Sequence, residues 1–213
     1  MDVVVAGGHG KVAQALERML AERGQRARGL VRDSDHAPDL ERLGAAAVVC
    51  DLERERDLSP YVEGADAVVF VAGAGPGSSA DRKRTVDLGG ALKLIHAARA
   101  RGVRRYVMVS SIGAGDPAAG PGQLRPYLDA KAEADAALAG SGLDFTIVRP
   151  GRLTDEPGTG LVTAGSEVAR GEIPREDVAA VLLAVLEADG ATVGKTFNVV
   201  AGETPVEEAV RAL

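Results

Sequence analysis

Apolar residues along this chain follow two alternating patterns. Short runs rich in β-branched residues predict strands, and longer stretches in which apolar positions recur every three or four residues predict helices. The predicted strands cover residues 3–5, 27–31, 45–50, 65–71, 105–110, 144–148 and 196–200. The predicted helices cover residues 11–23, 36–43, 81–101, 124–139 and 175–187, with a terminal helix from Pro205 and a weakly helical or irregular stretch at 54–62.

Strands that alternate with helices along the whole chain predict an α/β fold. Residues 65–71 are almost purely apolar, as expected of a strand that is buried on both faces of a parallel sheet. Right-handed crossovers between such strands give a doubly wound parallel sheet. The length of 213 residues fits a single compact domain. We expect residues 151–213, where the pattern first loosens, to form a small C-terminal segment on the substrate side.

Charge and rare residue types narrow the class of protein. The net charge is −6, no basic block is present, aromatic residues make up 3% and Trp is absent, so a nucleic-acid surface is not expected. Cys50 is the single cysteine, and His9, His36 and His96 are scattered, which argues against a disulfide and a metal site. No apolar run is long enough to span a membrane, and a strand is predicted where a signal peptide would lie. We therefore expect a cytoplasmic protein. We also expect it to be a monomer or a homodimer.

A glycine-rich turn joins the first predicted strand to the first predicted helix. In GGHGKVA, Gly7 suits a tight turn, Gly10 leaves room for a diphosphate, and Ala13 allows the helix to pack closely on the strand. Backbone N–H groups and the positive end of the helix dipole attract phosphate there. The spacing differs from GxGxxG, and a plain strand-to-helix connection is the alternative. The flanking strand and helix favour a dinucleotide site, and hence an NAD(P)-binding Rossmann fold.

The end of the second predicted strand bears on the choice of nicotinamide cofactor. Arg32 stands where an acidic side chain would hold the ribose 2′-hydroxyl in an NAD site. A guanidinium at that place matches a 2′-phosphate, which favours NADP(H) over NAD(H). The alternatives are that Arg32 is an ordinary surface residue and that Asp33, next to it, serves NAD.

Two further strand ends carry residues suited to an adenosine. After the third strand, Asp51 could accept a hydrogen bond from the adenine amino group while Leu52 lies against the ring, although Asp51 could equally cap a turn. After the fourth strand, Ala72 and Gly73 are small enough for a flat dinucleotide to lie over them. Glycines are also ordinary loop residues.

The candidate chemistry lies on the predicted helix 124–139. Tyr127 and Lys131 are four residues apart and therefore share a helix face. An ammonium near a phenol moves its pKa from about 10 toward neutrality, which would make Tyr127 a general acid. Ser111, at the end of the fifth strand, would hold the substrate oxygen. Because side chains alternate along a strand, only one of Ser110 and Ser111 can readily point inward.

These stretches together resemble the atypical short-chain dehydrogenase/reductases of the NAD(P)H-binding, NmrA-like and epimerase/dehydratase-like group. The resemblance covers nearly the whole chain and is carried by GGHGKVA at 7–13, VRD at 31–33, CDL at 50–52, TVD at 85–87, GVRRYVMVSS at 102–111, YLDAK at 127–131, IVRPG at 147–151 and EIPREDVA at 172–179. It implies a cofactor site formed by Gly7, His9, Gly10, Lys11, Val12, Arg32, Asp51, Leu52, Ala72, Gly73, Lys131, Pro150, Gly151 and Leu153.

The pattern and the resemblance together favour an NADP(H)-dependent oxidoreductase that acts on a small carbonyl or alcohol. Ser111, Tyr127 and Lys131 are its expected catalytic residues. One alternative is a non-catalytic NADP(H) sensor of the NmrA-like kind. Another is a flavin or biliverdin-reductase-like enzyme, which needs only hydride delivery. The chain lacks the separate substrate domain of extended family members, which argues against epimerisation of nucleotide sugars. The loops 113–122 and 155–165 are rich in Gly, Pro and small residues and could form a lid over the substrate, although ordinary loops have the same composition.

Overall fold

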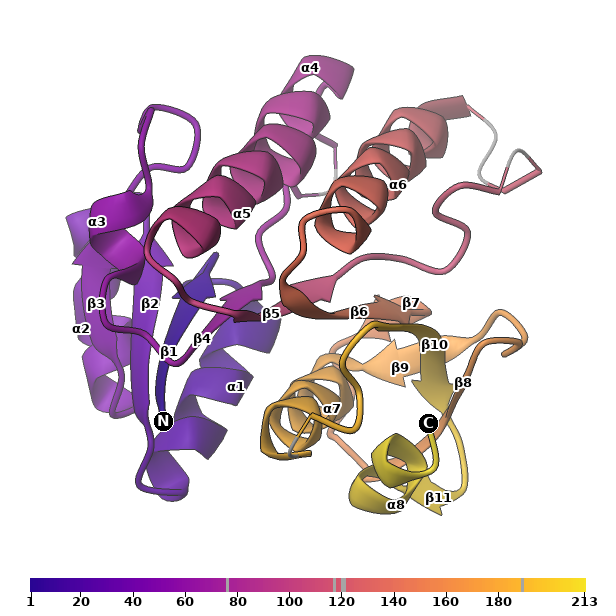
Figure 1. Cartoon of the computed structure of the whole chain (residues 1–213). Coiled ribbons are helices and arrows are strands. Elements are labelled where there is room, and N and C mark those ends of the chain that lie inside the picture. Colours follow the sequence, from indigo (N-terminus) through magenta and orange to yellow (C-terminus); the bar gives the residue numbers. More distant parts are fainter. Residues whose placement is uncertain (76, 117, 120–121, 189) are drawn as a thin grey trace.

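A nine-stranded sheet runs through the protein in the order β11-β8-β10-β6-β5-β4-β1-β2-β3. The structure is a computed structural model, and it describes the chain except for residues 76, 117, 120–121 and 189 (Figure 1). The strands are β1 (Asp2–Ala6), β2 (Arg26–Val31), β3 (Ala46–Val49), β4 (Ala67–Phe70), β5 (Arg105–Val109), β6 (Asp144–Pro150), β8 (Leu161–Gly165), β10 (Lys195–Ala201) and β11 (Thr204–Pro205). Every pairing from β3 to β10 is parallel, which confirms the predicted α/β class.

Helices cover both faces of this sheet (Figure 1). One face carries α1 (Lys11–Glu22), α2 (Ala37–Arg42), α7 (Arg175–Glu187) and α8 (Val206–Arg211), and the other carries α3 (Ser59–Val62), α5 (Ala91–Ala100) and α6 (Arg125–Ala139). Short 3-10 turns lie at Ser34–His36 and Gly122–Leu124. Alternate residues of β1 enter the two cores, Val3 and Val5 on the α1 face and Val4 and Ala6 on the α5 face. Among the described helices, none combines the length and the apolar character that a bilayer crossing demands.

The helix predicted over residues 81–101 is not a uniform α-helix. It consists of α4 (Ala80–Lys83), a π-helical segment (Arg84–Gly90) and α5. A π turn holds more residues than an α turn, so it changes which side chains face the sheet. Apolar periodicity cannot predict such a change because it assumes a constant 3.6 residues per turn.

The prediction for the C-terminal part was incomplete. Residues 161–165, expected to lie in a loop, form β8, which runs antiparallel to β10, so the sheet is not parallel throughout. A second, two-stranded sheet pairs β7 (Arg152–Thr154) with β9 (Glu172–Pro174). These strands are short, with three to five residues each. β8 also packs closely on the turn between β10 and β11, because a Cβ at Gly202 would stand 2.2 Å from Thr163 Oγ1. The predicted loop at 113–122 includes residues 117, 120 and 121, which lie outside the described residues.

A carboxyl group is buried in the core on the α1 face. Glu17 has no exposed surface, and neither of its side-chain oxygens has a hydrogen-bond partner in the described part of the chain. A Cβ added at Gly29 on β2 would stand 2.4 Å from Glu17 Oε1, so the strand needs glycine there. Burial raises the pKa of Glu17 from 4.5 to about 8. The folded protein therefore holds a proton at neutral pH that the unfolded chain releases.

We predict that Glu17→Met makes stability less dependent on pH. The unfolded chain loses the Glu17 proton near pH 4.5 and the folded protein near pH 8, so the free energy of unfolding falls as the pH rises between these values. Without the carboxyl group this fall disappears, so the free energy of unfolding of Glu17→Met at pH 7 should exceed that of the native protein by roughly 3 kcal/mol. Urea unfolding of both proteins, followed by circular dichroism across this pH range, measures the difference.

The matched control is Glu22→Met on the same helix, which removes an exposed carboxylate that pairs with Arg18 at 2.8 Å. This control should keep the native pH dependence. A Glu17→Met protein whose stability falls with pH as steeply as the native protein would contradict the prediction.

Candidate functional site

The carboxyl ends of the parallel strands border two adjoining cavities. One, of about 360 Å³, lies at the ends of β1, β2, β3 and β4, and the other, of about 580 Å³, lies at the ends of β4, β5 and β6. Val71, Ala72 and Gly73, which directly follow β4, line both. The strand order reverses between β1 and β4, and open α/β sheets usually bind their ligands at that point.

The glycine-rich turn lies against the end of β4. Gly7 has a φ of +92°, and a Cβ on it would stand 2.8 Å from Ala72 Cα, so a side chain is excluded there. The N–H of Gly10 donates to the Gly7 carbonyl at 2.8 Å, and Ala13 is fully buried. Gly10 caps α1 without a side-chain hydrogen bond, and no acidic residue lies in the first turn of that helix. The helix N-terminus thus fits a diphosphate.

Arg32 lies where the sequence predicts a contact with a 2′-phosphate. It lines the 360 Å³ cavity and also an adjoining surface cavity of about 610 Å³ that it shares with Asp33, Asp51, Glu53 and Arg54. The side chain is exposed, and no carboxylate in the described part of the chain pairs with it. Its guanidinium is therefore available to a ligand.

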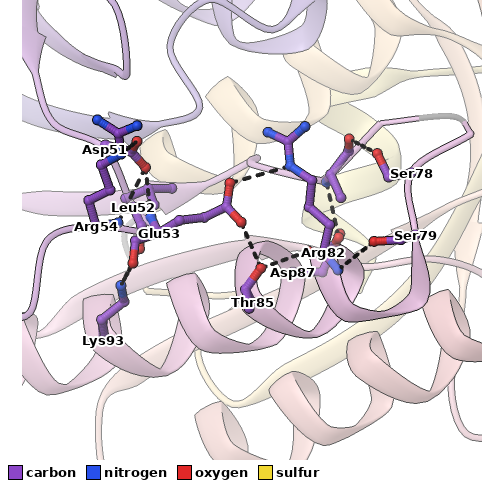
Figure 2. Close-up of polar contacts among 11 residues, drawn as sticks. Asp51, Leu52, Glu53, Arg54, Ser78, Ser79, Arg82, Thr85, Asp87 and Lys93 are labelled. Carbon is purple, nitrogen blue, oxygen red and sulfur yellow. Dashed lines mark hydrogen bonds and ion pairs between the residues drawn. The ribbon is translucent and has the colours of Figure 1, made fainter.

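The rim of the 360 Å³ cavity is fixed by polar contacts (Figure 2). Asp51 Oδ1 accepts hydrogen bonds from the N–H groups of Glu53 at 2.9 Å and Arg54 at 3.4 Å, so this carboxylate caps a turn. The Glu53 carboxylate in turn accepts hydrogen bonds from the Thr85 hydroxyl at 2.7 Å and from Arg82 Nε at 3.3 Å, so it connects this turn to α4 and the π-helical segment. Leu52 is only 9% exposed and lines the cavity. The alternative interpretation of Asp51 as a turn residue thus holds in the structure, and its adenine contact stays a prediction.

Two stacked histidines form another part of the same cavity. The rings of His9 and His36 are parallel, with centroids 3.7 Å apart. His9 Nε2 lies 2.8 Å from Asp39 Oδ2, and this hydrogen bond holds the pKa of Asp39 below its usual value. The sequence pointed to His9 through the family resemblance. It gave no signal for His36, which follows a strand end at no recognisable spacing.

Lys11 is the predicted cofactor residue whose side chain lies away from the cleft. Its Nζ pairs with Asp155 Oδ2 at 2.6 Å, and it lines neither the 360 Å³ nor the 580 Å³ cavity. Arg175 Nη1 pairs with the other oxygen of Asp155, also at 2.6 Å. The hydrogen bond from Lys11 and the charge of Arg175 hold the pKa of Asp155 below its usual value. Asp155 therefore links the first helix to the C-terminal segment, and Arg175 reaches the 580 Å³ cavity.

The predicted catalytic residues lie together around the 580 Å³ cavity. Ser111, Tyr127 and Lys131 line it, and so do Val12, Pro150, Gly151 and Leu153, which the family resemblance places in the cofactor site. Gly151 has a structural need for glycine as well, because a Cβ there would stand 2.3 Å from the Gly171 carbonyl oxygen.

Of the two serines that follow β5, Ser111 is the one left for a ligand. Ser110 is buried and donates from its Oγ to Asp135 at 2.9 Å, while Arg149 pairs with the same carboxylate at 2.7 Å. Burial raises the pKa of Asp135, and its bonds to Ser110 and Arg149 oppose that effect. The Ser111 hydroxyl makes only a long contact, 3.3 Å, to the Ile112 carbonyl.

Lys131 is held by the carboxylate of Asp87, a residue to which the sequence gave no role in the site. Its Nζ lies 3.2 Å from Asp87 Oδ1, and both side chains are almost wholly buried. The ammonium also donates to the carbonyls of Val109 at 3.2 Å and Ala72 at 3.5 Å. Asp87 belongs to the π-helical segment and lines the 580 Å³ cavity. Its signal in the sequence was the TVD stretch at 85–87, which is part of the family resemblance.

Known proteins are similar to this chain over most or all of its length. A family model described as NAD(P)H-binding matches residues 7–189. The Bacillus subtilis protein called uncharacterized sugar epimerase YhfK is 38% identical over 215 residues that span all of both chains.

Solved structures of other proteins are also similar to this chain over its whole length. A Bacillus halodurans protein provisionally named an NAD-dependent epimerase/dehydratase is 44% identical, with a TM-score of 0.93 and full coverage of both chains. The oxidoreductase ylbE of Lactococcus lactis is 30% identical, with a TM-score of 0.88, over 100% of this chain and 96% of its own. The resemblance predicted from the sequence is thereby confirmed. The match to the family model over most of the chain shows that the protein belongs to the NAD(P)H-binding family of Rossmann-fold proteins.

Proposed function

We propose that the protein is an NADP(H)-dependent oxidoreductase that transfers hydride to or from a small carbonyl or alcohol. The observation that carries the proposal is the shared wall of the two cavities at Ala72 and Gly73. A helix N-terminus that suits a phosphate lies on one side of this wall, and Ser111 and Tyr127 lie on the other.

The residues present fit each part of the cofactor. The diphosphate would lie over the turn from Gly7 to Gly10, where α1 offers unpaired N–H groups. The adenosine would occupy the 360 Å³ cavity beside Leu52, with its 2′-phosphate at Arg32. The nicotinamide would lie in the 580 Å³ cavity against Val12, Pro150 and Leu153. When bound, the nicotinamide supplies or accepts the hydride.

The side chains around the second cavity would manage the proton. During reduction a hydride forms the new C–H bond at the substrate carbon, and the C=O π pair moves to the oxygen. Tyr127 would give its proton to that oxygen and regain one from water, while Ser111 donates a hydrogen bond to the same oxygen. Oxidation of an alcohol would follow the same path in reverse.

The C-terminal segment would form the substrate side of the site. Residues 151–213 contribute Gly151, Leu153 and Arg175 to the 580 Å³ cavity, which Leu124 also lines. The lining of the 580 Å³ cavity consists largely of small or apolar residues. The substrate we propose is therefore a small organic molecule with one reducible oxygen.

We predict that Arg32→Ala weakens NADPH binding without weakening NADH binding. Loss of a charge-assisted hydrogen bond to the 2′-phosphate costs about 1.5–3 kcal/mol, so the NADPH dissociation constant should rise on the order of 10- to 100-fold. Fluorescence titration with each nucleotide measures both constants. Arg54→Ala is the matched control, because Arg54 is an exposed arginine that lines only the adjoining 610 Å³ cavity. Equal loss of affinity for the two nucleotides would contradict the role of Arg32.

We predict that Tyr127→Phe keeps NADPH binding and lowers turnover about 10²- to 10⁴-fold, because the variant lacks the proton donor. NADPH consumption is measured with a panel of aldehydes, ketones and quinones, and Ser111→Ala is assayed alongside. Unchanged turnover in Tyr127→Phe would reject the tyrosine as acid and favour hydride delivery alone. A native protein that binds NADPH and consumes it with no member of the panel would favour a sensor.

A further inference from the structure

The environment of Lys131 differs from that of a lysine that activates a neighbouring tyrosine with its free charge. The side chain is 4% exposed, and its ammonium lies between the Asp87 carboxylate and the carbonyls of Val109 and Ala72. It also lies 5.6 Å from the ring centre of Phe70 and 5.7 Å from that of Tyr127. A buried charge interacts strongly with its neighbours because water does not screen it.

Asp87 is placed to cancel that charge. One of its oxygens, Oδ2, accepts a hydrogen bond from the Ala74 N–H at 3.0 Å (Figure 2). The other, Oδ1, lies 3.2 Å from Lys131 Nζ in an ion pair and has no aligned hydrogen bond in the described part of the chain. A Cβ on Gly73 would stand 3.1 Å from this Oδ1, so the strip after β4 packs directly on the carboxylate.

The geometry points to a role for Asp87 in setting the polarity of the site. We propose that its carboxylate neutralises Lys131, so that Tyr127 remains a neutral phenol and the site is prepared to donate a proton, as reduction of a carbonyl requires. This inference rests on the proposed function, and it adds that the site is set for reduction of a carbonyl. Asp87 acts through Lys131 and is therefore a positioning residue.

Other charged groups near Tyr127 come from several elements. Lys83 on α4 and Arg175 on α7 line the same cavity, and Arg175 is paired with Asp155. On α6 itself, Asp129 pairs with Arg125 at 2.8 Å, and Asp135 is held by Ser110 and Arg149. All of these remain in the variants compared below, apart from Asp129 in the control. A difference between the variants and the native protein therefore reports on the buried pair.

The test follows the ionisation of Tyr127 by phenolate absorbance, without substrate. The chain has three tyrosines and no Trp, and burial raises the pKa of both Tyr61 and Tyr106, so these two ionise late. Subtracting the titration of Tyr127→Phe from that of each parent isolates Tyr127. In Asp87→Asn, which keeps the shape and removes the negative charge, the Tyr127 transition should move to lower pH by on the order of one to two units.

A charge series keeps the test decisive if one variant folds poorly. Lys131→Met leaves the negative charge and should move the transition to higher pH, and the double variant Asp87→Asn/Lys131→Met should return it close to the native value. Asp129→Asn, which removes a half-exposed carboxylate from the same helix, should leave the transition within a few tenths of a unit. Circular dichroism checks that each protein is folded.

A Tyr127 transition at the same pH in the native protein, Asp87→Asn and Lys131→Met would overturn the inference. NADPH titration of the same proteins separates this result from failure of the proposed function. Loss of the charge effect with intact NADPH binding rejects only the role of Asp87, whereas a native protein that does not bind NADPH rejects the proposed function and leaves the tyrosine measurement valid.

Discussion

A buried ammonium group holds the functional end of this sheet together. The Lys131 ammonium is almost wholly buried, and a carboxylate and two carbonyls surround it. These acceptors come from the end of β4, the end of β5 and the π-helical segment, while the lysine comes from α6. One side chain thus fixes four pieces of the chain that are distant in sequence. One of these acceptors, Ala72, lines both cavities, so the contact lies where they meet.

Close backbone contacts at two glycines also fix the arrangement of the cleft. The glycine-rich turn packs against the backbone that follows β4 because Gly7 has no side chain. In the same way, the backbone that follows β6 packs against Gly171 because Gly151 has no side chain. The C-terminal segment is then joined to the first helix through Asp155, between Lys11 and Arg175. Backbone contacts of this kind leave little freedom at the centre of the cleft, whereas the ion pairs at its edge are exposed and weak.

The sequence predicted what depends on local pattern. The parallel strands, the glycine turn and the side chains at the strand ends all followed from apolar runs and from the geometry of a parallel sheet. It could not predict β8, whose antiparallel pairing with β10 is a tertiary contact, or the π-helical segment that carries Asp87 inward. The ion pair of Lys11 is another tertiary contact that the sequence could not predict, because its partner Asp155 is far away in the sequence; the cofactor contact that the resemblance implies for Lys11 stays a prediction.

The far edge of the sheet has a consequence for how chains of this kind meet one another. The sheet ends at β11, which has only two residues, and Pro205 is one of them. Proline lacks the amide hydrogen with which a further strand would pair, and so short an edge offers almost no ladder. Strand addition from a neighbouring molecule is thus discouraged on that side. The short strand β11 thus covers the edge of β8 at Leu161 and Val162 and offers a neighbouring strand almost no partner there.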